Sequence, residues 1–122
     1  MKLTALDHVA IAVADVEASA RWYVEVLGFE RMHSGHWDGV PTFVGVNGTG
    51  IALFPQKERA GNPGSTGVLH FAFRAPRNEF LRGQEELTRR SISFDFEDHG
   101  ISHSIYFRDP DGHQVEITTY EL

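Results

Sequence analysis

Two histidines and one glutamate are the residues of this sequence best suited to binding a divalent metal ion. His8 and His70 each lie in a segment where apolar residues alternate with others, and Glu116 lies in a third such segment. Two neutral imidazoles and one carboxylate suit Fe²⁺, Mn²⁺, Zn²⁺, Co²⁺ or Ni²⁺ better than Ca²⁺ or Mg²⁺. Three protein ligands leave one face of the ion open, so substrate or water could bind there.

The alternation predicts that all three candidate ligands point away from the apolar core. Successive side chains of a strand lie on opposite faces of the sheet. His8 alternates with Val9, Glu116 alternates with Val115, and His70 follows the same rule. If the apolar faces pack beneath helices and the sheet curls, the three ligands share one concavity. The alternative for each histidine is an ordinary hydrogen-bonded or half-exposed side chain that binds no metal.

The elements that must position these residues occur in the same order in each half of the chain. The first half predicts a helix between an Asp15 N-cap and a Gly28 C-cap, and strands at residues 6–13, 29–33, 42–46 and 51–54. The second half predicts a helix over about 78–90, with Asn78 as a candidate cap, and strands at 68–74, 92–96, 102–108 and 113–119. A Gly- and Pro-rich linker over about 56–66 separates modules of about 5–55 and 67–120. We expect one domain over residues 1–122, because each half alone is too small for a stable core.

Superposition of the two halves marks Ala52 as the counterpart of Glu116. Setting His8 on His70 aligns the first strands, and setting Gly48 on Gly112 aligns the last turns. A pseudo-twofold axis would then present four inward positions, three of which carry ligand-type side chains. The alanine at the fourth position leaves an opening beside the metal.

Composition narrows the classes of function. With 122 residues, 41% hydrophobic and 23% charged, the chain has the composition of an ordinary globular protein. The net charge of -6 argues against a nucleic-acid partner, and no apolar run reaches the length of a membrane-spanning helix. The sequence contains no cysteine, which excludes disulfides and thiolate ligands. The N-terminal segment lacks the features of a signal peptide, so a cytoplasmic location is expected.

Three parts of the chain resemble the vicinal oxygen chelate superfamily, which includes glyoxalase I, extradiol ring-cleaving dioxygenases, fosfomycin thiol transferases and bleomycin-binding proteins. They are LDHVAI at 6–11 with LGF at 27–29, LHFAF at 69–73, and IYFRDPDGHQVE at 105–116, of which the last is the most specific. The resemblance implies an α+β fold of paired βαβββ modules that form an incomplete barrel around a divalent metal, with His8, His70 and Glu116 as ligands. A homodimer is expected, because an open sheet edge on a short chain invites pairing. In relatives of this size ligands can come from two subunits, so His8 could meet the other two ligands of a partner copy.

Ala52 separates the branches of this superfamily. Glyoxalase I resembles this chain but carries a fourth ligand, typically a glutamate, at the matching position, and an alanine can neither bind a metal nor act as a base. The dioxygenase branch uses two histidines and one glutamate on Fe²⁺ and places a histidine upstream of a tyrosine, which His99 and Tyr106 match. We therefore favour extradiol-type dioxygenase chemistry on a small oxygen-chelating substrate, with Fe²⁺ as the cofactor and Tyr106 and His99 as catalytic residues.

Both proposed catalytic residues have a plainer alternative. Tyr106 could simply pack on the surface of a sheet, and His99 could be a solvated loop residue. Glu97 departs from the dioxygenase pattern. His103 is the alternative to His99 as the catalytic histidine, although strand alternation places it on the helix-packing face or at a strand edge.

A thiol transferase of the fosfomycin-resistance type, or a lyase, is the second candidate, with Mn²⁺, Zn²⁺ or Ni²⁺ as the ion. The lysine and threonine that such transferases use for a phosphonate fall near Phe96 and on Ala10 here. Arg74 and Arg108 face inward by parity and could substitute, or they could be solvated. The third candidate is a non-catalytic binder of planar drugs, like the bleomycin-binding proteins, which keep the fold and lose the metal.

The candidate substrate-binding residues are aromatic. Trp37 lies with His33 and His36 in a glycine-flanked segment that either covers the cavity as a loop or forms an exposed hairpin turn. Phe54 and Phe96 are expected to line an apolar pocket, although aromatic residues in strands more often belong to the core. His113, beside the last turn, is expected to be exposed.

Overall fold

Each half of the chain folds as one strand, one helix and three further strands, as the repeated pattern predicts. The computed structural model describes residues 1–2, 5–56, 68 and 70–122, and the chain divides into two compact units, Met1–Pro63 and Gly64–Leu122. Positions 57–66 of the expected linker lie outside the described residues. The elements of the first unit, unit 1, are β1 (His8–Val13), α1 (Val16–Leu27), β2 (Glu30–Met32), the 3-10 turn η1 (Trp37–Gly39), β3 (Thr42–Val46) and β4 (Thr49–Pro55). Those of unit 2 are β5 (Phe71–Arg74), α2 (Arg77–Arg89), β6 (Asp95–Asp98), β7 (His103–Arg108) and β8 (Gln114–Thr119).

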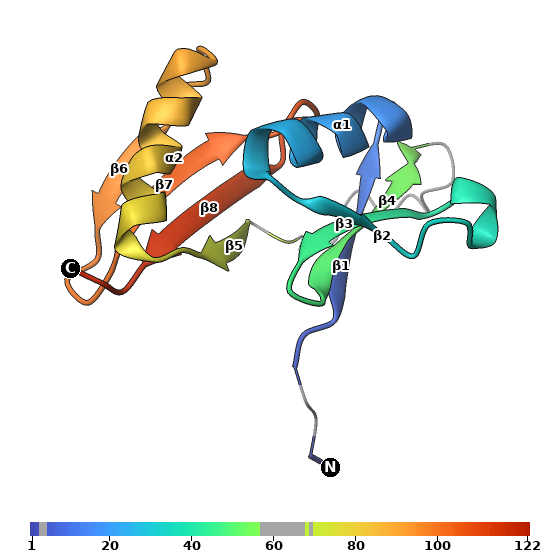
Figure 1. Ribbon diagram of the computed structural model, residues 1–122, viewed down its shortest axis with the longest axis horizontal. Helices are drawn as coiled ribbons and strands as arrows, with labels where there is room; N and C mark the ends of the chain where they lie inside the picture. Colours follow the sequence, from blue (N-terminus) through green and yellow to red (C-terminus); the bar gives the residue numbers. More distant parts are fainter. Residues whose placement is uncertain (3–4, 57–67, 69) are drawn as a thin grey trace. The chain divides into compact units, whose positions relative to one another are not determined.

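The two sheets have the same topology (Figure 1). Strands run in the order β1-β4-β3-β2 in unit 1 and β5-β8-β7-β6 in unit 2. The first strand of each unit pairs in parallel with the last one, and all other neighbours are antiparallel. Each sheet is therefore mixed and open, which confirms the expected α+β class and the βαβββ order of each unit.

Helix α1 begins and ends as its sequence predicts. The Asp15 side chain accepts a hydrogen bond from the Ala18 amide at 3.0 Å, which satisfies one of the free N–H groups of the first turn. Gly28 adopts a left-handed conformation with φ 71°, and its amide bonds back to the Val24 carbonyl. Tyr23 of this helix is fully buried over the sheet. The apolar alternation of β1 thus meets an apolar helix face, which leaves the other side chains of the sheet on the opposite face.

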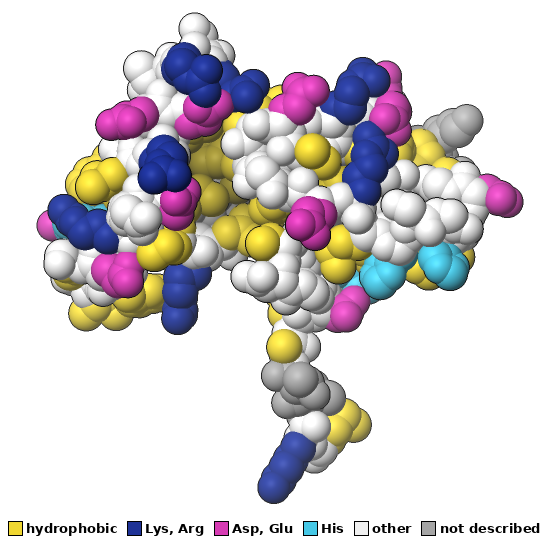
Figure 2. Space-filling view, viewed as in Figure 1, with side chains coloured by type: hydrophobic (Ala, Val, Ile, Leu, Met, Phe, Trp, Pro, Cys, Tyr) yellow, Lys and Arg dark blue, Asp and Glu magenta, His cyan; other side chains and the backbone are white. Residues whose placement is uncertain are grey.

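Helix α2 differs from expectation at its start. Asn78 is not the cap; Pro76 occupies that position and offers no side-chain hydrogen bond. The Arg77 amide instead donates to Glu121 Oε2 at 2.6 Å, so a carboxylate from the C-terminal segment sits at the positive end of the helix. The exposed side of α2 carries interspersed acidic and basic side chains (Figure 2), among them the Glu79–Arg82 ion pair at 3.1 Å.

Two predicted strand boundaries in unit 2 are wrong. The strand expected at 92–96 begins only at Asp95, because Ser91 takes a positive φ of 59° and the Ile92 amide closes the end of α2 by bonding to Leu87. The strand expected at 68–74 begins at Phe71. His70 therefore stands immediately before β5 rather than inside a strand.

The cores lie between each helix and its sheet. In unit 1 the buried side chains include Val13, Ala20, Tyr23, Val44, Ile51 and Leu53. In unit 2 they include Phe80, Leu87, Ile105, Phe107 and Val115. No helix among the residues that the structure describes is long and apolar enough to cross a membrane.

Candidate metal centre

Strand register in unit 2 places Glu116, Tyr106 and Ala72 in one row across the sheet. Glu116 of β8 pairs with Ala72 of β5 on one side and with Tyr106 of β7 on the other. Paired residues in a sheet point to the same face, and so does a residue two positions away on the same strand. His70, two residues before Ala72, follows this alternation. We call this side of the sheet, opposite to the side that packs on α2, the Glu116 face.

The structure brings two of the three predicted ligands together. His70 Nε2 lies 3.5 Å from Glu116 Oε1. Two donor atoms that each lie about 2.1 Å from a shared tetrahedral ion are separated by about 3.4 Å, so this pair already has the spacing of two ligands of one metal. The donor set of one imidazole nitrogen and one carboxylate oxygen fits a divalent transition metal.

The environment of Glu116 also fits a bound cation. Its side chain is only 11% exposed, and no lysine or arginine forms an ion pair with it among the residues that the structure describes. A buried carboxylate is costly unless it is paired or coordinates a metal. Its one ion pair in the described part of the chain is with His70.

Tyr106 and His99 extend this cluster. Hydrogen bonding to the Glu116 carboxylate, with a smaller contribution from burial, raises the pKa of Tyr106 to about 12. The hydroxyl group therefore stays protonated and donates to the carboxylate. His99 Nε2 lies 2.9 Å from Tyr106 Oη, so it is the donor of that hydrogen bond when the tyrosine proton points at Glu116. The ring of His70 meets Tyr106 edge-on, with centroids 5.7 Å apart.

A cavity of about 320 Å³ opens beside these residues on the Glu116 face. It lies wholly within unit 2 and is lined by His70, Asp95, Glu97, Tyr106, Arg108 and Gln114. Sequence reasoning had not singled out Asp95 and Glu97 as site residues. The alternation of side chains in β6 could have revealed them. Asp95 and Glu97 point to the side of the sheet opposite to Phe96, and Asp95 pairs with Tyr106.

His8, the third predicted ligand, lies at the equivalent place in unit 1. Its Nδ1 is 2.7 Å from Asp7 Oδ2, so Nδ1–H donates to the carboxylate and Nε2 remains available as a ligand. The residue two positions after His8 pairs with Ala52, which confirms the predicted correspondence of Ala52 and Glu116. Convergence of His8 with the pair in unit 2, within one chain or between two copies, stays a prediction.

Trp37 belongs to an aromatic cluster in unit 1. Its indole lies 5.5 Å from the ring of Phe43 and 5.8 Å from that of His33, and Phe43 in turn lies 5.1 Å from His8. Figure 2 shows histidine side chains side by side at the surface near β2 and η1. Trp37 is 54% exposed, so one part of the indole is free to stack on a ligand.

The two phenylalanines predicted to line a pocket lie in different settings. Phe54 pairs in register with Ala12 and shares the face of Ala52 in unit 1, half-buried. Phe96 pairs with Ile105, on the side of the sheet that packs on α2, and its ring lies 6.5 Å from Phe80. Because that is opposite to the Glu116 face, Phe96 cannot line the cavity beside Tyr106. His103 lies on the same side as Phe96, as its parity predicts.

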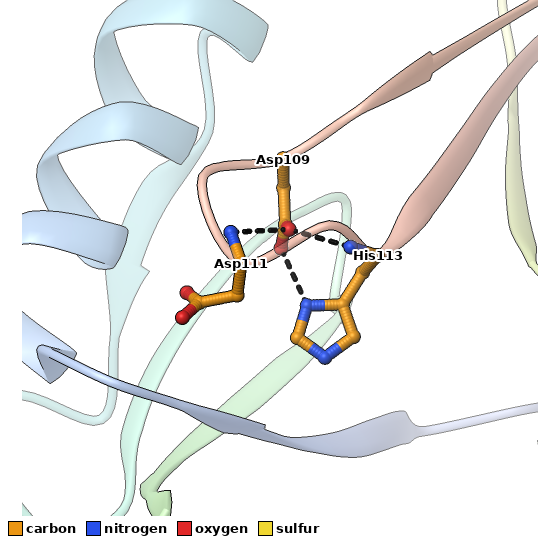
Figure 3. A group of neighbouring side chains, drawn as sticks. All are labelled: Asp109, Asp111 and His113. Atoms are coloured by element: carbon orange, nitrogen blue, oxygen red, sulfur yellow. Dashed lines mark hydrogen bonds and ion pairs between the residues drawn. The ribbon is translucent and has the colours of Figure 1, made fainter.

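Asp109, Asp111 and His113 form a second cluster of candidate donor groups, with atoms within 4.8 Å of one another (Figure 3). Asp109 Oδ1 accepts from the amides of Asp111 and His113, and its Oδ2 lies 2.8 Å from His113 Nδ1. The hydrogen bond to buried Asp109 raises the pKa of His113. Both Asp109 carboxylate oxygens already accept hydrogen bonds within the turn. We therefore interpret this cluster as a set of hydrogen bonds that stabilises the β7–β8 turn. His113 is half-buried, whereas the sequence predicted an exposed side chain.

Comparison with known proteins gives consistent matches. The family model described as "Glyoxalase/Bleomycin resistance protein/Dioxygenase superfamily" matches residues 5–117. The chain is 28% identical over 128 aligned positions to the metallothiol transferase FosB of Staphylococcus epidermidis, covering 100% of this chain and 86% of the relative. It is 31% identical over 118 positions to biphenyl-2,3-diol 1,2-dioxygenase 2 of Rhodococcus globerulus, covering 90% of this chain and 60% of that one. A lactoylglutathione lyase of Agrobacterium tumefaciens has the same fold, with a TM-score of 0.77, 23% identity and coverage of 98% and 96%.

Proposed function

The chain belongs to the glyoxalase/bleomycin resistance protein/dioxygenase superfamily, and from this premise we propose that it is a divalent-metal enzyme acting on a small substrate with neighbouring oxygen atoms. The observation that carries the proposal is the 3.5 Å approach of His70 Nε2 to the buried Glu116 carboxylate, beside a cavity that Tyr106 lines. His8, His70 and Glu116 would hold the ion. When bound, such an ion supplies Lewis acidity toward two chelating oxygens and stabilises negative charge on them.

The residues around the pair fit extradiol-type ring cleavage with Fe²⁺. In that reaction the carbon–carbon bond beside a catechol diol breaks, both atoms of O₂ enter the product, and no external reductant is consumed. Tyr106 Oη and His99 Nε2 are joined by a hydrogen bond of 2.9 Å, so the pair could hold or deliver the proton of a substrate hydroxyl. Trp37 is the candidate for stacking on the aromatic ring, because its exposed indole lies in the cluster that includes His8. The dioxygenase relative supports this assignment.

Thiol transfer to a small electrophile is the second candidate. It is supported by the metallothiol transferase relative, which matches over the whole of this chain. Because the sequence contains no cysteine, the thiol would come from a co-substrate. The two carboxylates in the cavity count against an anionic electrophile such as a phosphonate.

An anaerobic assay separates these functions. Protein loaded with Fe²⁺ is mixed with a panel of catechols and then with oxygen, and ring-cleaved product is followed by its absorbance. We expect product with the native chain and none with His70→Ala. His103→Ala is the matched control, since that histidine lies on the α2 side of the same sheet. Absence of product across the panel, with metal bound, would remove the dioxygenase assignment. A non-catalytic binder would hold planar ligands without stoichiometric metal.

A further inference from the structure

One wall of the cavity on the Glu116 face is acidic. Asp95 pairs in register with Tyr106, and Glu97 lies two residues farther along β6, so both carboxylates are on the cavity side of the sheet. Both line the cavity of about 320 Å³. The strand thus presents two negative charges beside the candidate metal ligands.

These two negative charges are only partly compensated within unit 2. The Asp95 carboxylate forms no hydrogen bond or ion pair with the residues that the structure describes. Glu97 Oε2 is 3.7 Å from His99 Nε2, which is longer than a hydrogen bond. Arg108 also lines the cavity and keeps its positive charge, but its Nη1 donates to the Gly112 carbonyl at 2.9 Å, which holds the guanidinium toward the β7–β8 turn. A ligand in the cavity therefore meets carboxylates on the β6 side.

We propose that Asp95 and Glu97 act as a specificity wall, selecting substrates whose oxygen-chelating head carries a cationic, amine-type substituent. This inference rests on the proposed function, because the head must bind at the metal centre. A substrate with negative oxygens at one end and a positive group at the other is complementary to a cation at His70 and Glu116 and to carboxylates on β6. Phosphonate or carboxylate substituents are disfavoured by repulsion from the same two side chains.

Three catechols with short side chains of different charge test the specificity wall. Dopamine is cationic, 4-ethylcatechol is neutral and 3,4-dihydroxyphenylacetate is anionic. Binding is measured by calorimetry on protein saturated with Zn²⁺, whose lack of redox chemistry prevents turnover. Because each partly exposed charge pair changes affinity by about threefold, we expect dopamine to bind about tenfold more tightly than the anion, with 4-ethylcatechol between them. Added salt is expected to weaken the preference.

Charge-removing variants locate the effect. In the double variant Asp95→Asn, Glu97→Gln the three affinities are expected to converge. Asp98→Asn is the control, because it removes one charge from the same strand but that side chain lies toward His103, on the α2 side. It is expected to retain the order of affinities.

The outcomes distinguish this inference from the proposed function. Equal affinities of the three catechols for Zn²⁺-loaded native protein would overturn the specificity wall and leave the metal centre in place. Loss of the preference in Asp98→Asn as well as in the double variant would assign it to net charge, and would also overturn the wall. Failure to bind Zn²⁺ or any catechol would overturn the proposed function, and the inference with it.

Discussion

Units 1 and 2 have the same strand topology and register, but only unit 2 has an acidic candidate ligand, Glu116, at the shared position. His8 is the first residue of β1 and His70 immediately precedes β5, and in each unit the residue two positions later pairs with the last strand. That partner is Ala52 in unit 1 and Glu116 in unit 2. Backbone register therefore supplies equivalent places, and the side chain at each place decides what chemistry a unit can do.

The residues that pair with Ala52 and Glu116 on the adjacent strand also differ between the two units. Phe43 pairs with Ala52 as Tyr106 pairs with Glu116. Each ring meets the histidine of its unit edge-on, with centroids 5.1 Å apart for His8 and Phe43 and 5.7 Å apart in unit 2. The packing is thus nearly the same in both units, while one hydroxyl group and one carboxylate distinguish the unit proposed to act on substrate.

The largest effect is expected when Glu116 is replaced by the residue of unit 1. Glu116→Ala removes one of the three proposed protein ligands, so affinity for Zn²⁺ should fall at least about 100-fold, the upper end of the range seen on losing a group that only supports a ligand. Calorimetric titration measures the affinity, and circular dichroism checks that the variant is folded. Unchanged affinity in a folded variant would mean that this carboxylate does not bind the metal.

Tyr106→Phe gives unit 2 the ring found in unit 1. If the hydroxyl group holds or delivers a proton, kcat should fall about 100-fold, while affinity for the metal changes by less than about threefold. Steady-state kinetics on the cleaved catechol gives kcat, and metal titration gives the second value. A kcat equal to that of the native chain would show that the Tyr106 hydroxyl group takes no part in catalysis and that only its aromatic ring contributes.

The histidines also differ in their supports. Asp7 precedes His8 and accepts from its Nδ1, whereas a leucine precedes His70. Asp7→Asn should weaken Zn²⁺ binding about tenfold, because a carboxylate that orients a ligating imidazole also raises its basicity. Glu30→Gln, which removes a charge from β2, is the control. If both variants weaken Zn²⁺ binding equally, Asp7 affects the affinity only through the net charge of the protein.

The smallest effect concerns the hairpin turns. The β3–β4 turn rests on Asn47 and Gly48, both at positive φ, whereas the β7–β8 turn is locked by Asp109 and His113. Asp109 raises the pKa of His113 in the folded state, so this stabilisation is complete below the unfolded value of about 6.5 and is lost as pH rises through the folded pKa. His113→Gln should therefore lower the free energy of unfolding by about 0.5–1 kcal/mol more at pH 5.5 than at pH 9. Urea melts at the two pH values measure this, and a loss that is larger at pH 9 would contradict it.

Much of this frame could be predicted from local signals. The Asp15 and Gly28 caps, the Asn47–Gly48 turn and the faces of the strands follow from hydrogen-bonding capacity and period-two alternation. The equivalence of Ala52 and Glu116 followed from aligning Gly48 with Gly112 in the last turn of each half. These features are determined by residues close to one another in the sequence, so they can be predicted from one sequence alone.

Features that depend on distant groups could not be predicted. Glu121 replaces a local cap at α2, and the Ser91 turn delays β6, so the expected strand at 92–96 contained Asp95 but ended before Glu97, the second carboxylate that lines the cavity. The hydrogen bond between His99 and Tyr106 links a hairpin loop to the next strand. Phe96 was assigned to the pocket by residue type, although its parity with Ile105 places it against the helix.

X-ray absorption spectroscopy of the Zn²⁺-loaded protein measures whether His8, His70 and Glu116 bind the same ion. We expect one ion per site with two imidazole nitrogens and carboxylate oxygen among its ligands, and one imidazole fewer in each of the variants His8→Ala and His70→Ala. Coordination that is unchanged in both variants, or no stoichiometric ion in the native protein, would contradict it.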